Sequence, residues 1–378
     1  MKHENTSGQF HTRPAELAMI NEQKNIPYAP VLIPTLCRDQ HFIRCVESLK
    51  KNTWARFTDI YIALDYPAKE EHRDGYNKIC SYLSEGDFSI FHDFHVVKRE
   101  KNYGVNLNSR MLTNDILTRY DRFIRTDDDI EFSPDFLEYM DKCLAYYEKD
   151  PTVIGVTGYS HPVNWEISEG SNTFKLGCLA MMWGIGFWRD SFLDLYENLH
   201  NGCLRDEFDE AVRTKAIYKM IDASFIDYLY ILSEDSDRDL GLLNGPSDIA
   251  VGIYMQLHDR YMISPVLSKA RNWGFDGSGI YCGNTLTLKN GNTTDNYNYR
   301  KQQIDQSISF TLRPDPVIHE STNRKILNEF YYRSMPRIIK GRFKLWLYKT
   351  VGKEQYRKSV RCLKQYAKLA NKIVRKRD

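Results

Sequence analysis

The stretch that decides the fold is FIRTDDDIEF, residues 123–132, in which a short apolar run leads into three consecutive aspartates. Asp127, Asp128 and Asp129 place three like charges side by side, which costs free energy unless a cation binds or all three are solvated. Hard divalent cations such as Mg²⁺ and Mn²⁺ prefer carboxylate oxygens and often hold a substrate phosphate as well. The stretch is therefore either a cation site or a solvated acidic loop.

Strands and helices are expected to alternate around this stretch. Apolar runs predict strands at residues 31–33, 60–64, 94–97, 122–126 and 153–156. Alternation with helices predicts an α/β fold with a mostly parallel sheet flanked by helices on both faces. Thr35, Asp65 and Asp127 each follow an expected strand, so we expect them along one edge of the sheet, where ligand crevices form. This convergence favours the cation site.

A helix is expected directly after the aspartates. Ser133 is predicted as its N-cap, with Pro134 at the first helical position. Phe136, Met140 and Cys143 follow at spacings of four and three residues, which predicts one buried face.

The composition is that of an ordinary soluble globular protein: 378 residues, 42% hydrophobic and 27% charged. No apolar run approaches the roughly 18 residues needed to span a bilayer. The first 30 residues lack a signal-peptide core, so a cytosolic start is expected. The eight cysteines are scattered without a Cys-x-x-Cys pair, which argues for reduced thiols and against zinc. We expect an N-terminal extension (1–28), a main domain (29–285) and a C-terminal region (286–378).

The C-terminal region is strongly basic. Residues 336–378 contain 15 Lys or Arg against two acids, a charge of +13, which leaves −11 for the rest of the chain. Ile339, Phe343 and Trp346 share one helical face with basic residues on both sides. This pattern predicts either an interfacial amphipathic helix on an anionic surface or a helix packed on the body. No nucleic-acid-binding motif is visible, so no nucleic-acid partner is expected.

Two further segments contain glycines next to aromatic residues. Between Trp183 and Trp188, the glycines Gly184 and Gly186 predict either close approach of a ligand to the backbone or a bulged core strand. Residues 269–279, KARNWGFDGSG, lack the form of a P-loop and are interpreted as a flexible flap.

The order of these features resembles the GT-A class of nucleotide-sugar glycosyltransferases. The residues that carry the resemblance are Pro34-Thr35 with Arg38, Ala63-Leu64-Asp65, Asn102-Tyr103-Gly104, Asp127-Asp128-Asp129 and Ser133-Pro134-Asp135-Phe136. The chain is most similar to the branch of N-acetylglucosaminyltransferase I and to bacterial polysaccharide glycosyltransferases. The similarity runs from about residue 30 to 282 and is strongest between 125 and 140.

The resemblance implies a role for each matching residue. Asp65 would recognise uracil, Arg38 would contact the nucleotide, Asp127 and Asp128 would face the ribose and sugar, and Asp129 would hold Mn²⁺ or Mg²⁺ together with Asp127. The full nucleotide-sugar-binding set is Thr35, Arg38, Asp65, Asn102, Asp127, Asp128, Lys269 and Arg271. The expected sugar or acceptor pocket consists of Trp183, Gly184, Trp188 and Trp273.

Asp248, which opens a helix after a turn, matches the catalytic base. Two departures from the family pattern matter: the first acid of the triplet is Asp127 where relatives often have Glu, and the base region lacks an aromatic-flanked acid pair. If Asp248 is only a helix cap, Glu234 and Asp235 are the next candidates.

The resemblance implies a metal-dependent, inverting glycosyltransferase that moves a sugar from a nucleotide donor, expected to be UDP-linked, to a glycan or lipid-linked oligosaccharide in surface polysaccharide synthesis. The basic tail would attach it peripherally to the inner face of the membrane. Two alternatives stay open. A sugar nucleotidyltransferase would carry a glycine-rich phosphate loop after the first strand, where residues 34–39 contain no glycine. A non-catalytic carbohydrate- or nucleic-acid-binding protein would account for the basic tail.

Overall fold

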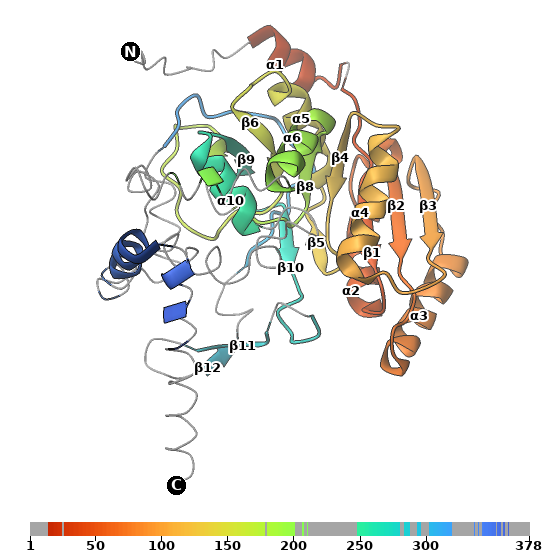
Figure 1. The fold of residues 1–378 in the computed structure, drawn as a ribbon. Coiled ribbons are helices and arrows are strands. Elements are labelled where there is room, and N and C mark those ends of the chain that lie inside the picture. The colour runs from red at the N-terminus through yellow and green to blue at the C-terminus, as the bar shows by residue number, and fades with distance from the viewer. Residues whose placement is uncertain are drawn as a thin grey trace.

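An eight-stranded sheet forms the centre of the structure, which is a computed structural model (Figure 1). Its strand order is β3-β2-β1-β4-β8-β6-β9-β7. The strands are β1 (Val31–Thr35), β2 (Asp59–Leu64), β3 (Asp93–Lys98), β4 (Arg122–Arg125), β6 (Val153–Thr157), β7 (Thr173–Leu176), β8 (Ile185–Trp188) and β9 (Tyr261–Pro265). Only β7 and β8 run antiparallel to their neighbours in this sheet. The predicted α/β class with a mostly parallel sheet is confirmed.

The structure describes most of the chain apart from its two ends and several internal segments, the longest of which is 211–247. The described residues are 14–24, 26–177, 180–200, 206–207, 210, 248–279, 283–287, 293–295, 302–319, 336, 339, 342–352, 354–356, 358–359 and 362. Within them, no helix is long and apolar enough to cross a membrane.

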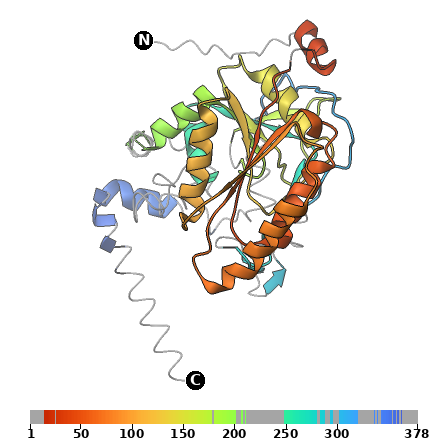
Figure 2. The same cartoon turned by 90° about the vertical axis from the view of Figure 1, so that its right-hand side faces the viewer.

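Helices cover both faces of the sheet (Figure 2). The helices α2 (Asp39–Lys50), α3 (Arg73–Glu85) and α5 (Phe136–Tyr147) pack on one face, and α4 (Gly104–Leu117), α6 (Arg189–His200) and α10 (Asp248–Leu257) pack on the other. Side chains of a strand alternate between the faces. Val31 and Ile33 accordingly join the cluster under α2 and α5, whereas Leu32 joins the cluster under α4.

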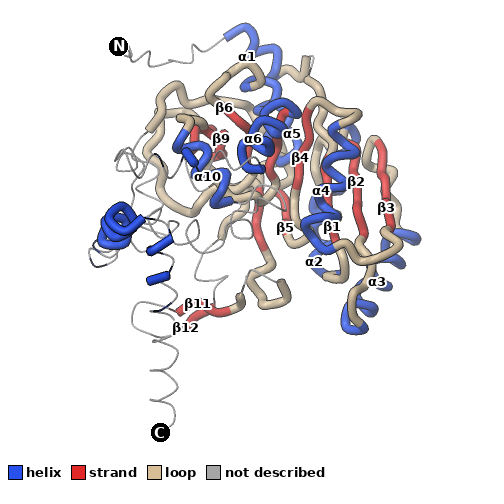
Figure 3. Tube along the Cα trace, viewed as in Figure 1, coloured by secondary structure: helices blue, strands red, loops and turns tan. Residues whose placement is uncertain are grey.

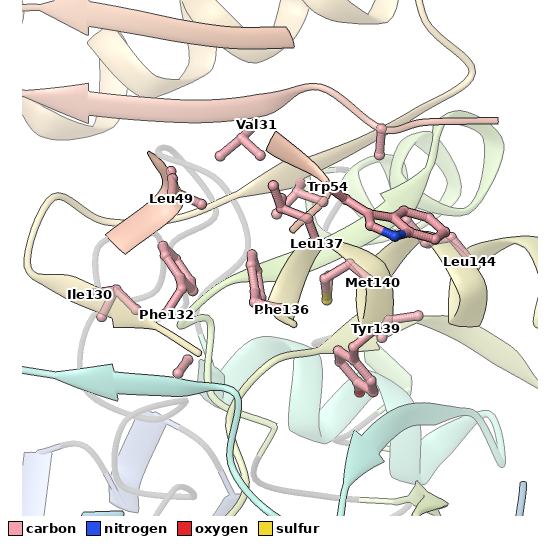
Figure 4. Packing of buried hydrophobic residues seen from close by; sticks show 14 of the residues in the cluster. Val31, Leu49, Trp54, Ile130, Phe132, Phe136, Leu137, Tyr139, Met140 and Leu144 are labelled. Carbon is pink, nitrogen blue, oxygen red and sulfur yellow. The ribbon is translucent and has the colours of Figure 1, made fainter. Parts of the chain in front are cut away.

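Helix α5 is almost entirely buried and supplies much of the core under the aspartates. Figure 4 shows Phe136, Leu137, Met140 and Leu144 pointing into the cluster that also contains Val31. Phe132, from the short strand before the helix, stacks on Phe136 with 4.1 Å between ring centroids. The apolar face predicted from the sequence is confirmed.

The predicted N-cap of this helix is wrong. Asp135, and not Ser133, occupies the cap position, and its side chain makes no capping bond. Instead, the Ser133 hydroxyl donates to Asp135 Oδ1 at 2.7 Å. The other oxygen, Asp135 Oδ2, is held by the buried ammonium of Lys269 at 2.5 Å. This long-range ion pair takes the carboxylate away from the helix end.

Smaller elements complete the body (Figure 3). Strand β5 (Ile130–Phe132) pairs antiparallel with β10 (Ala270–Asn272), and β11 (Thr285–Thr287) pairs with β12 (Thr293–Asp295). Helix α1 (Pro14–Asn21) precedes β1, and short 3₁₀ turns occur at Ala55–Phe57 and Glu70–His72. The β5–β10 pair matters for function, because it brings residues 273–279 against the aspartates.

A late segment, residues 302–319, returns to the body. Phe310 N–H donates to Glu138 at 2.9 Å, and the carbonyl of Phe310 accepts from the buried Lys142 ammonium at 2.7 Å. Further along, Leu312 N–H donates to Asn21 Oδ1 at 2.8 Å. Residues well beyond 285 therefore pack on the same core as the sheet.

Candidate active site

The three aspartates form the turn between β4 and β5, at the edge of the sheet where the parallel strands β1 and β4 end side by side. Thr35, the last residue of β1, donates its hydroxyl proton to Asp128 Oδ2 at 2.7 Å. Arg38, which immediately precedes α2, donates to Asp129 Oδ2 at 2.7 Å and also to Asp128 Oδ1. The structure thus brings together Thr35, Arg38 and the triplet, as the sequence predicted.

Arg38 is the internal counter-ion of the two buried acids. Burial opposes its charge, but Coulombic attraction to Asp128 and Asp129 outweighs this and raises the pKa of Arg38 further above its usual value. Burial raises the pKa of Asp128, although Arg38 pulls it down. Both effects follow from placing one cation among several carboxylates away from water.

Negative charge remains in excess at this edge. Burial raises the pKa of Asp127 to about 7, with a second contribution from the charge on Asp129 and an opposing one from Arg125. Asp129 Oδ1 is buried and has no hydrogen-bond partner within the described part of the chain. One carboxylate oxygen is therefore inside the protein with its acceptor capacity unused.

These residues fit a divalent cation that shares its coordination with a substrate. Asp127 and Asp129 offer carboxylate oxygens, one of them unpartnered. No cluster of three or more His, Cys, Asp or Glu side chains in the described ranges could hold a metal alone. Mg²⁺ and similar ions are commonly bound by one or two carboxylates plus substrate phosphates, which is the arrangement these residues allow.

Residues 273–279 lie directly over the aspartates. Trp273 N–H donates to the carbonyl of Asp129 at 2.9 Å. A Cβ added to Gly274 would lie 2.1 Å from Asp129 Oδ2, so only glycine permits this approach. Of the segment 269–279 predicted as a flap, residues 270–272 form β10, and residues 273 and 274 contact Asp129.

Trp273 is stacked between two arginines. The guanidinium carbons of Arg271 and Arg44 lie 4.1 and 4.3 Å from its ring centroid, and its indole N–H donates to Glu131 at 2.7 Å. Desolvation lowers the pKa of Arg271, and the like charge of Arg44 lowers it further. Two guanidinium groups therefore flank the ring of Trp273, whose backbone contacts Asp129, and they could bind an anionic group of a donor.

Sequence reasoning missed two residues of α2 that face the flap. Arg44 stacks on Trp273, and His41 Nε2 lies 2.8 Å from Asp276 Oδ2. The available signal was their spacing: Arg38, His41 and Arg44 are three residues apart and so share one helical face.

Asp65 directly follows β2, as predicted, but its carboxylate oxygens are fully used by hydrogen bonds within the protein. It accepts from the backbone N–H groups of Tyr66, Tyr103 and Gly104 at 3.0, 2.9 and 2.8 Å, and from Asn102 Nδ2 at 3.3 Å. A carboxylate has about four acceptor positions. Asp65 therefore holds the turn that begins α4, and a nucleobase could bind to it only by displacing one of these bonds.

Lys269 is not brought to this edge. Its side chain is buried, and its ammonium lies 2.5 Å from both Asp135 Oδ2 and Asp305 Oδ2. The interaction with Asp305 links β10 to the returning segment. With two carboxylates as partners, Lys269 has a structural role that the sequence pattern did not indicate.

Asp248 opens α10, and its Oδ1 accepts the N–H of Met182 at 2.9 Å. Burial raises the pKa of Asp248 to about 6, and the Met182 bond and Arg125 act against this rise. Arg125 also lowers the pKa of Asp127, so both acids lie within reach of the same guanidinium. Glu234 and Asp235 lie outside the described residues.

The residues of the predicted aromatic pocket do not lie together: some belong to the hydrophobic core and others lie near the aspartates. Trp188 is buried on β8, and its indole N–H donates a hydrogen bond to the carbonyl of Leu144 at 3.1 Å. Gly184 has φ +67° and lies where a Cβ would be 2.7 Å from the ring of Phe132. Trp183 is buried but packs edge-on against Phe275 of the flap at 5.8 Å. Trp183 and Trp273 thus lie near the acidic edge, whereas Trp188 belongs to the core.

Comparison with known proteins gives distant structural similarities only. No family model matches the chain, and no curated protein matches it. Staphylococcus aureus TarS is 11% identical with a TM-score of 0.30, over 45% of this chain and 30% of that one. TarS 1–349 in complex with UDP-GlcNAc is 12% identical with a TM-score of 0.29, over 44% and 47%. A mannosyltransferase, PcManGT from Pyrobaculum calidifontis, in complex with GDP-Man and Mn²⁺, is 11% identical with a TM-score of 0.28, over 49% and 54%.

One of the three is named a mannosyltransferase, and two of the three are complexes with a nucleotide sugar. The chain spans between 30% and 54% of the length of the three structures. With identities of 11–12% and TM-scores near 0.3, we argue function from the residues of this chain.

Proposed function

We propose that this chain is a metal-dependent glycosyltransferase that moves a sugar from a nucleotide donor, UDP-linked by resemblance, to a glycan acceptor. The observation that carries the proposal is the carboxyl edge of the sheet. There Asp128 and Asp129 are buried, and Asp129 Oδ1 has no hydrogen-bond partner among the described residues. Over the triplet lies a glycine-containing flap, and Arg44 and Arg271 stack on its Trp273 ring. A diphosphate and a divalent cation together would satisfy both the acidic and the basic groups.

We assign most of these residues to binding of the nucleotide-sugar donor. Asp129 and Asp127 would hold Mn²⁺ or Mg²⁺, which when bound stabilises the negative charge of a leaving nucleoside diphosphate. Arg271 and Arg44 are placed to bind anionic oxygens of the donor, and Trp273 between them keeps water from that side. Asp65 would act through Asn102 and Gly104 by holding the turn against which the nucleotide lies.

Asp248 is the base in this proposal. Its raised pKa of about 6 leaves it ionised near neutral pH yet able to accept the proton of an acceptor hydroxyl. A base that activates the acceptor opposite the leaving group gives single displacement, so we propose inversion at the anomeric carbon.

The acceptor and location follow from the charge distribution. A −11 body with a +13 C-terminal region fits peripheral attachment to the anionic inner face of a membrane. A lipid-linked oligosaccharide for surface polysaccharide synthesis is the acceptor that such a location would provide.

The test is release of nucleoside diphosphate from a panel of nucleotide sugars, with and without Mn²⁺. We expect metal-dependent release from one donor, and loss of at least tenfold in Asp129→Asn, which keeps the side-chain shape. Asp93→Asn is the matched control, because Asp93 is exposed at the start of β3. Failure of every donor to be hydrolysed or bound would refute the proposal and favour a non-catalytic binding protein. Release of pyrophosphate from a nucleoside triphosphate and a sugar phosphate would instead identify a nucleotidyltransferase.

A further inference from the structure

The C-terminal helix leaves an apolar stripe in solvent. Residues 342–352 are helical, and Phe343 and Trp346 on this helix are 58% and 56% exposed. Ile339, just before it, is 61% exposed. The rings of Phe343 and Trp346 lie 5.7 Å apart. At about 100° per residue, Ile339, Phe343 and Trp346 fall within roughly 60° of one another around the helix.

The opposite face of the same helix is anchored to the body. Leu345 and Tyr348 are buried in the cluster that contains α10 side chains such as Ala250. Tyr348 also packs edge-on against Tyr356 with 5.4 Å between centroids. Figures 1 and 2 show this blue helix at the periphery of the molecule. The helix therefore has two apolar faces. One packs against the body of the protein, and the other is exposed to solvent.

Basic residues border the exposed stripe on one side. By helical position Arg342 and Lys349 lie on that flank, whereas Lys344 lies nearer the face that packs on the body. The whole region from 336 onward carries +13, against −11 for the rest of the chain. A single-stranded nucleic acid would use the charges and could stack its bases on Phe343 and Trp346, but it would leave Ile339 exposed. A bilayer with anionic headgroups uses the charges and all the apolar side chains, because aromatic rings enter the interface while Lys and Arg meet phosphates.

We propose that Ile339, Phe343 and Trp346 form the insertion face of a membrane-docking helix that binds anionic lipid bilayers. The rest of the chain carries a net charge of the same sign as such a surface, so its repulsion would favour an orientation with this helix toward the bilayer. This inference rests on the C-terminal helix alone and does not depend on the proposed reaction.

The test uses the full chain and vesicles of phosphatidylcholine, with or without phosphatidylglycerol at about three parts in ten. Cosedimentation should be strong only with the anionic vesicles. The double variant F343S/W346S should bind them at least tenfold more weakly. L267S/I308S is the matched control, because Leu267 and Ile308 are 60% and 71% exposed but lie outside the helix. It should bind as the wild type does.

Tryptophan fluorescence supplies a second readout. The difference between the wild-type and Trp346→Phe emission spectra isolates Trp346, and it should shift to shorter wavelength when anionic vesicles are added. Equal sedimentation of F343S/W346S and wild type, or an unchanged Trp346 spectrum with bound vesicles, would overturn the proposal. Preferential binding of a single-stranded oligonucleotide over the vesicles would overturn it as well.

Discussion

The Arg38 guanidinium neutralises the acidic edge where a metal cation could otherwise bind. Its removal should lower the stability of the protein and should increase the stabilisation that added metal gives. Arg38→Met keeps the length and apolar stem but removes the guanidinium that pairs with Asp128 and Asp129. Breaking a fully buried pair costs about 3–5 kcal/mol. The Arg38 side chain is 24% exposed, and we therefore expect about 2 kcal/mol, using the lower part of that range discounted for solvent.

The assay is thermal unfolding with and without Mn²⁺, at an ionic strength matched with a sodium salt. A loss of about 2 kcal/mol should lower Tm by roughly 2–3 °C, because a chain of 378 residues has an unfolding entropy of about 0.8 kcal/mol/K. In wild type, Mn²⁺ must compete with Arg38 for Asp129, but in the variant it need not. A metal at about 100 times its Kd stabilises by about 2.7 kcal/mol, so Mn²⁺ should raise Tm more in Arg38→Met than in wild type.

Arg44→Met is the control for this experiment. Arg44 lies on the same helix and stacks on Trp273, so its loss should cost only about 0.5–1 kcal/mol. It should show no gain in the response to Mn²⁺. A variant Arg38→Met that melts like wild type, or that gains no more from Mn²⁺ than wild type does, would refute the reasoning that Arg38 occupies the place of the cation.

Three further predictions concern other residues of the structure. Gly274→Ala should displace the Asp129 carboxylate and cost about 1–3 kcal/mol of stability by overpacking. It should also weaken Mn²⁺ binding, measured by titration calorimetry. Gly283→Ala should change neither stability nor Mn²⁺ binding, because a Cβ added there would lie 4.0 Å from its nearest neighbour. Asp248→Asn should lower nucleotide transfer by about 10²-fold or more, and the wild-type rate should fall as pH drops through about 6, since the base is then protonated. Burial raises the pKa of Asp141 to about 8, above its unfolded value of 3.8, so stability should fall as pH rises from about 4 to about 8. Denaturant unfolding should be measured at pH 5 and pH 8. Between these two values the free energy of unfolding should fall less in Asp141→Asn than in wild type, by about 2–4 kcal/mol.

The local pattern was sufficient to predict the first half of the fold. Strands such as β1 and β2 are short apolar runs that end at Thr35 and Asp65, and the helices between them have one apolar face. Because parallel strands in such units all end at one edge, the position of the triplet followed from the order of elements. The prediction needed only short-range periodicity, which a sequence displays directly.

The second half depended on contacts between residues far apart in the chain. Lys269 was expected in a flap but is buried between Asp135 and Asp305, which are 134 and 36 residues away. Trp188 was expected in a pocket, but it lies on β8, which inserts antiparallel between β4 and β6. Buried cations and inserted strands are decided by such partners, and the sequence around each residue carries no sign of them.

Helix α2 connects the acidic triplet to the flap through three side chains on one face. Arg38 pairs with Asp128 and Asp129, His41 with Asp276, and Arg44 with the Trp273 ring. A Cβ on Gly274 would lie 2.1 Å from Asp129 Oδ2, so the loop packs directly against this carboxylate. Hence a ligand that withdraws Arg38 from the acids also alters the surface on which the flap rests. The residues at the start of α2 that neutralise the triplet also contact the flap that covers the site. The charge of this edge and its accessibility to ligands are therefore expected to change together.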